Sequence, residues 1–295
     1  MPRPAPSRHQ AWALLAAASA AGWAWGSRRA RPRRAAGRTR AGRAAGPARP
    51  RNDLRQYDDL ADHWWRREGE FAALHWLARA RGALLPPAPW PGAPLLDVGC
   101  GGGLLAPHVQ GYRHVGVDLV TSALTVAADA GVDPVRADSA RLPFADGAFA
   151  AVAAGEVLEH VDDLEGTVAE VCRVLAPGGT VVIDTIAATR FARLTLVDLA
   201  ERLPGGPPRH CHDPQRFVDP AMLAERFAAG GVRLALRGLE PHAGDYLRFL
   251  VDRGRSVRMR PVPRLAGVYQ GIGVKQSDGD QTATAHEEGA RAAGV

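Results

Sequence analysis

The feature that most constrains this chain is the segment LLDVGCGGGLLAPHV, which occupies residues 95–109. It places an apolar run and one acid, Asp97, directly before a cluster of glycines that includes Gly99 and Gly101. Such a run is typical of a buried strand that turns tightly into the start of a helix. Glycine is favoured where the backbone adopts positive φ or lets a ligand approach closely. The segment therefore predicts a ligand-binding loop, of a kind that nicotinamide, flavin and sulfonium cofactors all use.

The spacing of the glycines argues against a dinucleotide. The G-x-G-x-x-G fingerprint ends in a glycine that packs the helix against the strand, whereas this chain has Leu104 at that position. The pattern here is D-x-G-x-G-x-G, and the next expected strand ends at Asp118, 19 residues after Gly99. A carboxylate at that point accepts hydrogen bonds from the hydroxyls of a ribose. A third expected strand ends at Asp138, whose carboxylate would accept from an exocyclic amine in the same pocket.

Strand and helix patterns alternate from Asp53 onward. Strands are expected at 95–99, 114–118, 134–138, 148–154 and 180–186, with helices at 57–85, 121–131 and 162–179. The prolines at 86–87 and the Pro-Gly-Gly at 177–179 are typical of helix ends. This alternation predicts an α/β fold with a doubly wound, mostly parallel sheet. A ligand of such a sheet binds outside the carboxyl ends of the strands.

The net charge divides the chain into two unequal parts. The total is +6, but residues 1–51 contain twelve arginines and no acid, so the remainder has 25 basic residues against 31 acidic ones, a net of −6. A folded part with negative net charge lacks the basic surface that nucleic-acid binding needs. We therefore predict no nucleic-acid partner, a basic, disordered extension over 1–52, one folded domain over 53–275 and a disordered tail over 276–295.

An apolar stretch at 11–26 leaves several interpretations of the extension open. It is shorter than the run of about 20 apolar residues that spans a membrane. Ten of the twelve arginines follow this stretch and only two precede it, which is not the order of a secretory signal. A disordered or mis-started extension, a weak membrane anchor and an exported protein therefore all remain as interpretations.

The cysteines indicate a reducing compartment. Cys100, Cys172 and Cys211 are odd in number and widely separated, so they match neither a disulfide framework nor the spacing of a zinc motif. Proteins that keep their thiols reduced are typical of the cytoplasm. We therefore expect a cytoplasmic protein.

Several motifs together resemble one enzyme family. The glycine loop and the strand-end acids resemble the seven-stranded S-adenosylmethionine (SAM)-dependent methyltransferases. Five segments, ADHWWRREGEFAALHWLARAR, LLDVGCGGGLL, GEVLEHV, LAPGGTVVIDT and CHDPQRFVDPAML, resemble the ubiquinone-biosynthesis O-methyltransferases over most of the chain from Asp53 to Lys275. That family methylates catechol-type hydroxyls on polyprenylated rings. The resemblance implies a seven-stranded sheet, S-adenosyl-L-methionine as the cofactor and a small phenolic or lipid-like substrate.

The expected cofactor site combines the resemblance with the strand pattern. The resemblance itself places cofactor positions on Arg81 before the sheet, Gly99 in the loop, Asp118 after the second strand and Gly155 after the fourth. Together with the loop and strand-end residues, the expected site comprises Arg81, Asp97, Gly99, Gly101, Asp118, Asp138 and Gly155.

The segment GEVLEHV at 155–161 contains the residues expected to act on the substrate. Glu156, Glu159 and His160 would share one face if the segment forms a helical turn. Two carboxylates and an imidazole suit a divalent cation, and the resemblance implies a magnesium ion (Mg²⁺) on the same three residues. Such an ion would stabilise the oxyanion of a catechol, whose hydroxyl has a pKa of about 10.

His160 and Glu159 are accordingly the expected catalytic residues. A metal-independent interpretation is also open for this segment, because an E-H pair often ends the equivalent strand in methyltransferases that need no metal. His160 would then act as a general base or only as a hydrogen-bonding residue of the loop.

Three further segments each have more than one interpretation. His212 and Asp213 could orient the substrate or act as a base, and Asp213 could equally cap the helix that follows. Trp64 and Trp65 could cover the cofactor, but packing of the first helix on the sheet is the favoured interpretation. The amphipathic stretch 189–206 lies where the resembled family has a membrane-contacting insertion, and packing as a substrate lid explains the pattern equally well.

Two other functions stay open. Gly155, where relatives of the resembled family often have a larger residue, and the divergent segment 244–264 are compatible with another small-molecule O- or C-methyltransferase. Its substrate would be a polyketide, a phenolic or a menaquinone-pathway compound. A non-catalytic cofactor-binding module is disfavoured because the loop and its strand-end acids are intact. We expect an O-methyltransferase for a phenolic or catechol hydroxyl, cytoplasmic and peripheral to the inner face of the membrane.

Overall fold

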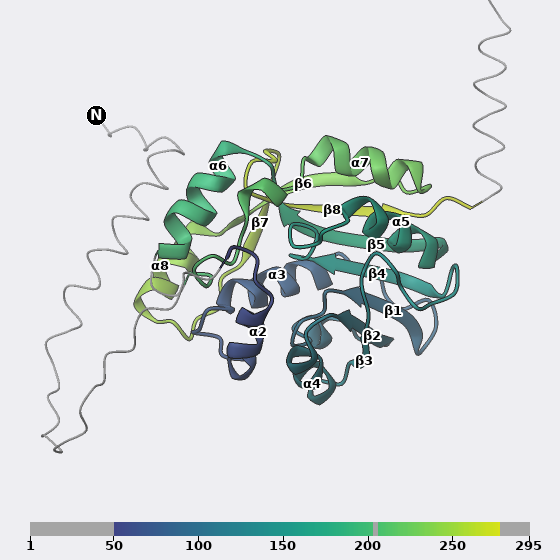
Figure 1. The fold of residues 1–295 in the computed structure, drawn as a ribbon, viewed down its shortest axis with the longest axis horizontal. Helices are drawn as coiled ribbons and strands as arrows, with labels where there is room; N and C mark the ends of the chain where they lie inside the picture. The colour runs from purple at the N-terminus through teal and green to yellow at the C-terminus, as the bar shows by residue number, and fades with distance from the viewer. Residues whose placement is uncertain (1–49, 203–205, 278–295) are drawn as a thin grey trace, which may run out of the picture.

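A mixed β-sheet forms the centre of the domain (Figure 1). The computed structural model describes residues 50–202 and 206–277, so the predictions for the apolar stretch 11–26 and for the tail after residue 277 lie outside the described residues. Within those residues the sheet has eight strands. They are β1 (Ala93–Val98), β2 (Tyr112–Asp118), β3 (Asp133–Arg136), β4 (Phe149–Gly155), β5 (Leu175–Ile186), β6 (Ala235–Pro241), β7 (Met259–Val262) and β8 (Val268–Val274).

The strand order is β3-β2-β1-β4-β5-β8-β6-β7. Strands β1 to β5 run parallel to one another, whereas β8, β6 and β7 continue the sheet in antiparallel pairs. The five strands expected from the sequence are β1 to β5, so the predicted doubly wound, mostly parallel α/β sheet is confirmed. The sheet has one strand more than the seven expected, because the short strand β7 pairs with β6 at the edge.

Helices cover both faces of this sheet. Figure 1 shows α5 and α7 near β5, β6 and β8, and α4 near β3 at the opposite end of the sheet. The helical elements are α2 (Arg55–Asp59), η1 (Ala61–His63), α3 (Ala72–Gly82), η2 (Ala106–His108), α4 (Thr121–Asp129), α5 (Leu164–Val174), α6 (Arg190–Ala192), η3 (Arg193–Leu199), η4 (Ala200–Arg202), η5 (Pro214–Arg216), α7 (Pro220–Ala229) and α8 (Ala243–Val251).

The alternation of side chains along β1 explains why both faces are covered. Successive residues of a strand point to opposite faces of the sheet. Leu96 packs with Val171 of α5 and Leu223 of α7. Its neighbour Leu95 packs on the other face with Leu105. Because β1 is apolar on both faces, it occupies the middle of the sheet and brings the glycine loop to the centre of the carboxyl edge.

The expectation of one helix over 57–85 is wrong. The chain instead forms α2, η1, a turn region over 64–71 and then α3. Gly69 lies in this interruption, and glycine weakens a helix interior by about 1 kcal/mol relative to alanine. The interruption also lets Trp64 turn onto the glycine loop, where its ring lies against Gly101 and Gly102. Trp64 fits the apolar spacing of a helix, but its side chain packs against the glycine loop.

The second long helix is shorter than its pattern indicates. A helix was expected over 162–179, but α5 ends at Val174. Asp163 caps its first turn by accepting a hydrogen bond from the Gly166 N–H. Residues 175–179 belong to β5, because Leu175 is fully buried opposite Phe149 of β4. The Pro-Gly-Gly therefore lies at the start of a strand rather than at the end of a helix.

Candidate active site

A cavity of about 740 Å³ opens at the carboxyl ends of the parallel strands. This is the edge at which the doubly wound pattern placed the ligand. All seven residues expected to bind the cofactor line this one cavity, namely Arg81, Asp97, Gly99, Gly101, Asp118, Asp138 and Gly155. Apolar residues of the helical segment 190–202 and of the β6 to β7 region line the rest of it.

The glycines of the loop satisfy both backbone and packing requirements. Gly99 has a φ of 67° and Gly101 a φ of 51°, which is the left-handed region that side chains disfavour. A Cβ on Gly99 would lie 2.3 Å from Cγ2 of Val157, and one on Gly101 would lie 2.5 Å from Cη2 of Trp64. Neither position therefore accommodates a side chain without displacing the neighbouring residue.

An aromatic stack covers the loop. The rings of Trp64 and Phe71 are stacked with centroids 4.3 Å apart, and Tyr57 stacks on Trp64 at 5.8 Å. All three residues line the cavity. Trp65 is 41% exposed and donates a hydrogen bond from Nε1 to the Gly102 carbonyl at 3.1 Å. Both tryptophans thus contact the glycine loop, whereas packing on the sheet was the favoured expectation.

Asp118 connects the loop to the start of α4. Its carboxylate accepts hydrogen bonds from the N–H groups of Gly101 and Val120, each at 2.9 Å. Burial raises the pKa of Asp118, and these backbone hydrogen bonds partly oppose the rise. Asp138 similarly accepts from the Ala140 N–H at 2.9 Å. Each carboxylate is therefore held in place on the cavity wall by backbone donors.

Asp97 has a more buried position than the other two acids. It is 3% exposed, and its Oδ2 lies 3.3 Å from Nε2 of His114 on β2. This carboxylate therefore both pairs with an imidazole and lines the cavity.

Arg81 of α3 forms an ion pair with Asp184 of β5 beside Gly155. The Nε of Arg81 lies 3.4 Å from Oδ2 of Asp184, and both side chains are buried. Burial raises the pKa of Asp184 to about 6, although the Arg81 charge lowers it in part. A Cβ on Gly155 would lie 0.9 Å from Nη1 of Arg81. The guanidinium therefore occupies the volume that any side chain at residue 155 would need.

The segment after β4 does not form the helical turn that would align Glu156, Glu159 and His160. Glu156 has a φ of 53°, and the turn begins after it, with the His160 N–H donating to the Val157 carbonyl at 2.9 Å. Glu159 is 1% exposed, and its Oε2 accepts a hydrogen bond from the Thr185 hydroxyl at 2.6 Å. The three residues therefore do not lie on one face of a helical turn.

These residues fit the expected magnesium ion only in part. Within the described residues, Oε1 of Glu156 and Oε1 of Glu159 are buried without a hydrogen-bond partner. Burial raises the pKa of Glu156, and the nearby Glu159 raises it further, so a cation between the two carboxylates would relieve their repulsion. His160 does not converge with them. Among the described residues it groups instead with Cys211 and His212, whose ligand atoms and its own all lie within 4.8 Å of one another.

Asn52 fixes the ring of His160. The Nδ1 of His160 lies 2.5 Å from the Asn52 amide oxygen, and the Asn52 amide donates to the His160 carbonyl at 3.0 Å. Burial lowers the pKa of His160 to about 3, so the ring is neutral at physiological pH. A neutral imidazole that donates from Nδ1 presents an unprotonated Nε2. Asn52 falls within the extension predicted over 1–52, but its side chain contacts His160 of the candidate site.

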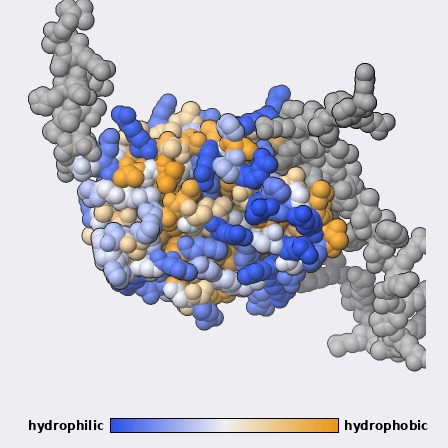
Figure 2. Space-filling view, turned by 180° about the vertical axis from the view of Figure 1, so that it is seen from behind, coloured by the Kyte–Doolittle hydropathy of each residue, from blue (hydrophilic) through white to orange (hydrophobic). Residues whose placement is uncertain are grey.

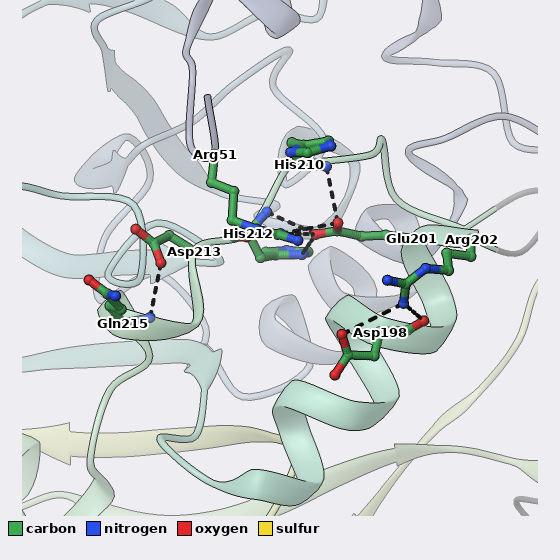
Figure 3. Close-up of polar contacts among 8 residues, drawn as sticks. All are labelled: Arg51, Asp198, Glu201, Arg202, His210, His212, Asp213 and Gln215. Carbon is green, nitrogen blue, oxygen red and sulfur yellow. Dashed lines mark hydrogen bonds and ion pairs between the residues drawn. The ribbon is translucent and has the colours of Figure 1, made fainter. Parts of the chain in front are cut away.

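A second set of contacts surrounds His212 (Figure 3). The Glu201 carboxylate accepts from the N–H groups of His210 and His212 at 3.0 and 3.1 Å. Arg51 pairs with the same carboxylate at 3.3 Å and donates to the His212 carbonyl at 2.6 Å. Asp213 points away from this set and caps η5 through the Gln215 N–H at 3.0 Å. Asp219, not Asp213, caps the longer helix α7.

Comparisons with known proteins show which proteins the chain is similar to. Residues 96–183 match the family model described as a methyltransferase domain. The chain is 35% identical over 214 residues to the ubiquinone biosynthesis O-methyltransferase of Cupriavidus pinatubonensis. This alignment covers 68% of this chain and 84% of the relative. It is 36% identical to the protein of the same description from Ralstonia nicotianae, over 66% of this chain and 87% of the relative. The rat mitochondrial protein is 31% identical, over 61% of this chain and 59% of the relative.

Solved structures share the fold. A SAM-dependent methyltransferase of Thermotoga maritima superposes with a TM-score of 0.54 at 17% identity, over 75% of this chain and 97% of that one. The magnesium protoporphyrin IX methyltransferase of Synechocystis PCC 6803 gives a TM-score of 0.52 at 15% identity, over 76% of this chain and 95% of that one. At these identities the likeness is one of fold alone.

The fold, the glycine loop and the strand-end acids define the class of this protein as a SAM-dependent methyltransferase. Within that class, the identities to the curated relatives are high enough to resolve the family. The chain belongs to the ubiquinone biosynthesis O-methyltransferase family, as its motifs predicted.

Proposed function

We propose that this enzyme transfers the methyl group of SAM to a phenolic or catechol hydroxyl of a polyprenylated quinone precursor. One observation carries the proposal: the single cavity of about 740 Å³ joins the cofactor residues to a large apolar chamber. Phe191 and Leu196 of the helical segment and Phe249 of α8 line this chamber. A ring with a prenyl tail needs an apolar chamber of this kind beside the methyl donor. The names of the curated relatives support the same substrate class.

The seven cofactor residues suggest an orientation for SAM. The ribose hydroxyls would donate to Asp118 and the adenine amine to Asp138, because both carboxylates line the cavity at strand ends. Arg81 would attract the carboxylate of the methionine moiety, since guanidinium and carboxylate form strong charge-assisted hydrogen bonds. The sulfonium methyl would then point toward the chamber and the His160 ring.

Methyl transfer itself requires alignment more than acid-base strength. The methyl group would pass in line from the sulfonium to the acceptor oxygen, the hydroxyl would release its proton and S-adenosylhomocysteine would leave, so the enzyme would contribute mainly by holding the two reacting atoms in a near-attack geometry. His160 lines the chamber with a fixed ring. We propose that its Nε2 positions the acceptor hydroxyl and that Glu159, buried against Thr185, supports the turn that carries His160.

Magnesium is a separate proposal for the carboxylates of Glu156 and Glu159 alone, because His160, the third predicted ligand, groups instead with Cys211 and His212. Turnover of a prenylated catechol should be lost in a strong chelator and return on addition of magnesium, while SAM binding persists. Glu159→Gln should reproduce the chelator effect, because it removes one oxygen ligand of a hard cation. The assay uses labelled SAM, with the methylated oxygen or carbon identified by mass spectrometry and NMR. Full activity in chelator would contradict magnesium, and a C-methylated product would favour the other small-molecule methyltransferases.

Membrane contact is proposed for the side of the molecule that carries α6 and α8. Leu194 is 62% exposed, and on α8 Leu247 is 45% and Val251 is 90% exposed. In Figure 2 this side lies at the right, where apolar residues reach the edge of the molecule. In the part of the chain that the structure describes, no helix has the length and apolarity to cross a bilayer. We therefore propose a peripheral contact with the inner face of the membrane, as a lipid-resident substrate would require.

Vesicle binding tests this contact and the proposed domain boundary together. A protein lacking residues 1–49 should fold, bind SAM and still bind vesicles of neutral lipid. The double variant Leu247→Glu/Val251→Glu should release it, because two charges would enter the acyl boundary. Neither residue lines the cavity, so SAM binding should persist. The matched control is Trp90→Glu, at a side chain 56% exposed on the loop before β1. Binding that depends only on residues 1–49 and disappears in salt would contradict the α8 contact and indicate the arginines instead.

A further inference from the structure

The geometry points to a binding site for a zinc-type ion formed by His160, Cys211 and His212. One potential ligand atom from each residue lies within 4.8 Å of the other two. His160 comes from the turn after β4, and the other two come from the loop before η5. Two imidazole nitrogens and a thiolate are the donor set of a borderline-soft ion, whereas magnesium prefers six oxygens. This set is thus different from the two carboxylates discussed above.

The spacing requires only a small contraction. A tetrahedral zinc ion has bonds of about 2.0 to 2.1 Å to nitrogen and about 2.3 Å to sulfur. Its ligand atoms are then about 3.3 to 3.8 Å apart, so the three side chains would move together by about 1 Å from the separations of the structure. Rotation of the side chains provides such a movement, and the backbone of the two segments need not change.

Outer partners orient both imidazoles. A metal-bound histidine nearly always donates from its other ring nitrogen to a carboxylate or an amide oxygen. Nδ1 of His160 lies 2.5 Å from the Asn52 amide oxygen. Nδ1 of His212 lies 3.5 Å from Oε1 of Glu201, a carboxylate that Arg51 holds in place (Figure 3). The Asn52 contact leaves Nε2 of His160 available to an ion, and the nearby Glu201 carboxylate, although too distant for a hydrogen bond to Nδ1, favours the same nitrogen of His212.

The proposed ion would have an open position toward the substrate. His160, Cys211 and His212 all line the cavity, and three protein ligands leave a fourth position of a tetrahedral zinc ion free. With the ion bound, the acceptor hydroxyl would bind to this open position instead of to Nε2 of His160, and there it would lose its proton more readily and would be oriented toward the methyl donor. This role rests on the proposed function, whereas ion binding itself does not.

Cobalt substitution tests the site directly. The full-length protein is freed of metal with a chelator and titrated with Co²⁺, whose spectrum reports on thiolate ligands and on tetrahedral geometry. We expect one equivalent of Co²⁺ to give a thiolate-to-cobalt charge-transfer band in the near ultraviolet and intense visible bands. Zinc should abolish these bands, and a large excess of magnesium should leave them unchanged.

Matched variants identify the ligands. Cys211→Ser should remove the charge-transfer band, whereas Cys172→Ser, at a buried thiol in the core behind the sheet, should retain it. Asn52→Ala should weaken Co²⁺ binding by about 10- to 100-fold, as is usual for loss of an outer partner. Glu156→Gln should leave the spectrum unchanged. Near-ultraviolet circular dichroism and SAM binding verify that each variant is folded.

Several outcomes would overturn the proposal. These are a wild-type protein that gives no charge-transfer band, a band that survives in Cys211→Ser, and displacement of cobalt by magnesium. The spectra are independent of turnover, so the two proposals fail separately. Zinc binding without methylation of any catechol would contradict the proposed function alone. Methylation by a protein that binds neither Co²⁺ nor zinc would contradict this site alone.

Discussion

Asp118→Ala should weaken SAM binding by about 5- to 150-fold, which corresponds to about 1 to 3 kcal/mol. The substitution removes the proposed acceptor for the ribose hydroxyls in a largely buried site. It also frees the Gly101 N–H, which donates to this carboxylate at 2.9 Å, so the glycine loop loses one of its hydrogen bonds to β2 and keeps those to the Val117 carbonyl. Isothermal titration calorimetry with SAM measures the change.

The control for Asp118 is Asp133→Ala. Asp133 lies at the start of β3, where its exposed carboxylate pairs with Arg113 on the surface. Its replacement should leave SAM affinity unchanged. Unchanged affinity in Asp118→Ala as well would exclude Asp118 from the cofactor site.

Asp184→Ala should lower the free energy of unfolding by about 3 to 5 kcal/mol at pH 7, because it leaves the buried Arg81 guanidinium without a counter-ion. Both side chains of the pair are buried, at 8% exposure for Arg81 and 0% for Asp184. Chemical denaturation measures the loss. Asp146→Ala, which removes an exposed partner of Arg173, should cost no more than about 1 kcal/mol. If Asp184→Ala costs as little as this control, the buried pair is not a structural requirement.

The same pair gives a pH dependence of known sign. The pKa of Asp184 rises from its ordinary value of 3.8 to about 6 in the folded protein. Between these values the folded state binds more protons than the unfolded state, so the contribution of this group to stability is present below 3.8 and is lost as the pH rises through about 6. In Asp184→Asn this pH-dependent loss of stability should disappear. Unfolding free energies of the wild type and of Asp184→Asn, measured between pH 4 and 7, test this expectation.

The parallel half of the fold could be predicted because its signals are local. Strands β1, β2 and β4 are apolar runs that end at the glycine loop, at Asp118 and at Gly155, and each boundary is marked by a change of residue type. The antiparallel strands β6 to β8 have no such markers, so the sequence patterns did not predict their ranges. The break in the first helix was missed because Trp64 has helical spacing, although its ring packs on a loop distant in sequence.

The residues of the candidate site also differ in whether the sequence alone identifies them. Residues adjacent to a motif, such as Asp118 and His160, were accessible from the sequence. Asn52 and Cys211 were not, because they reach His160 only through contacts across 108 and 51 residues of chain. Asp184 had one usable signal, an acid inside an apolar strand, since a buried carboxylate nearly always has a charged partner.

The overlap between Gly155 and Arg81 limits how this enzyme can change by mutation. Since Nη1 of Arg81 lies 0.9 Å from where a Cβ at residue 155 would be, the two positions are epistatic. A larger residue at 155 becomes acceptable only after residue 81 has become smaller, and that first step leaves Asp184 without its cation. Neutralising Asp184 first leaves the buried Arg81 guanidinium unpaired instead, so an evolutionary or engineered path that enlarges residue 155 has to change Arg81 and Asp184 together.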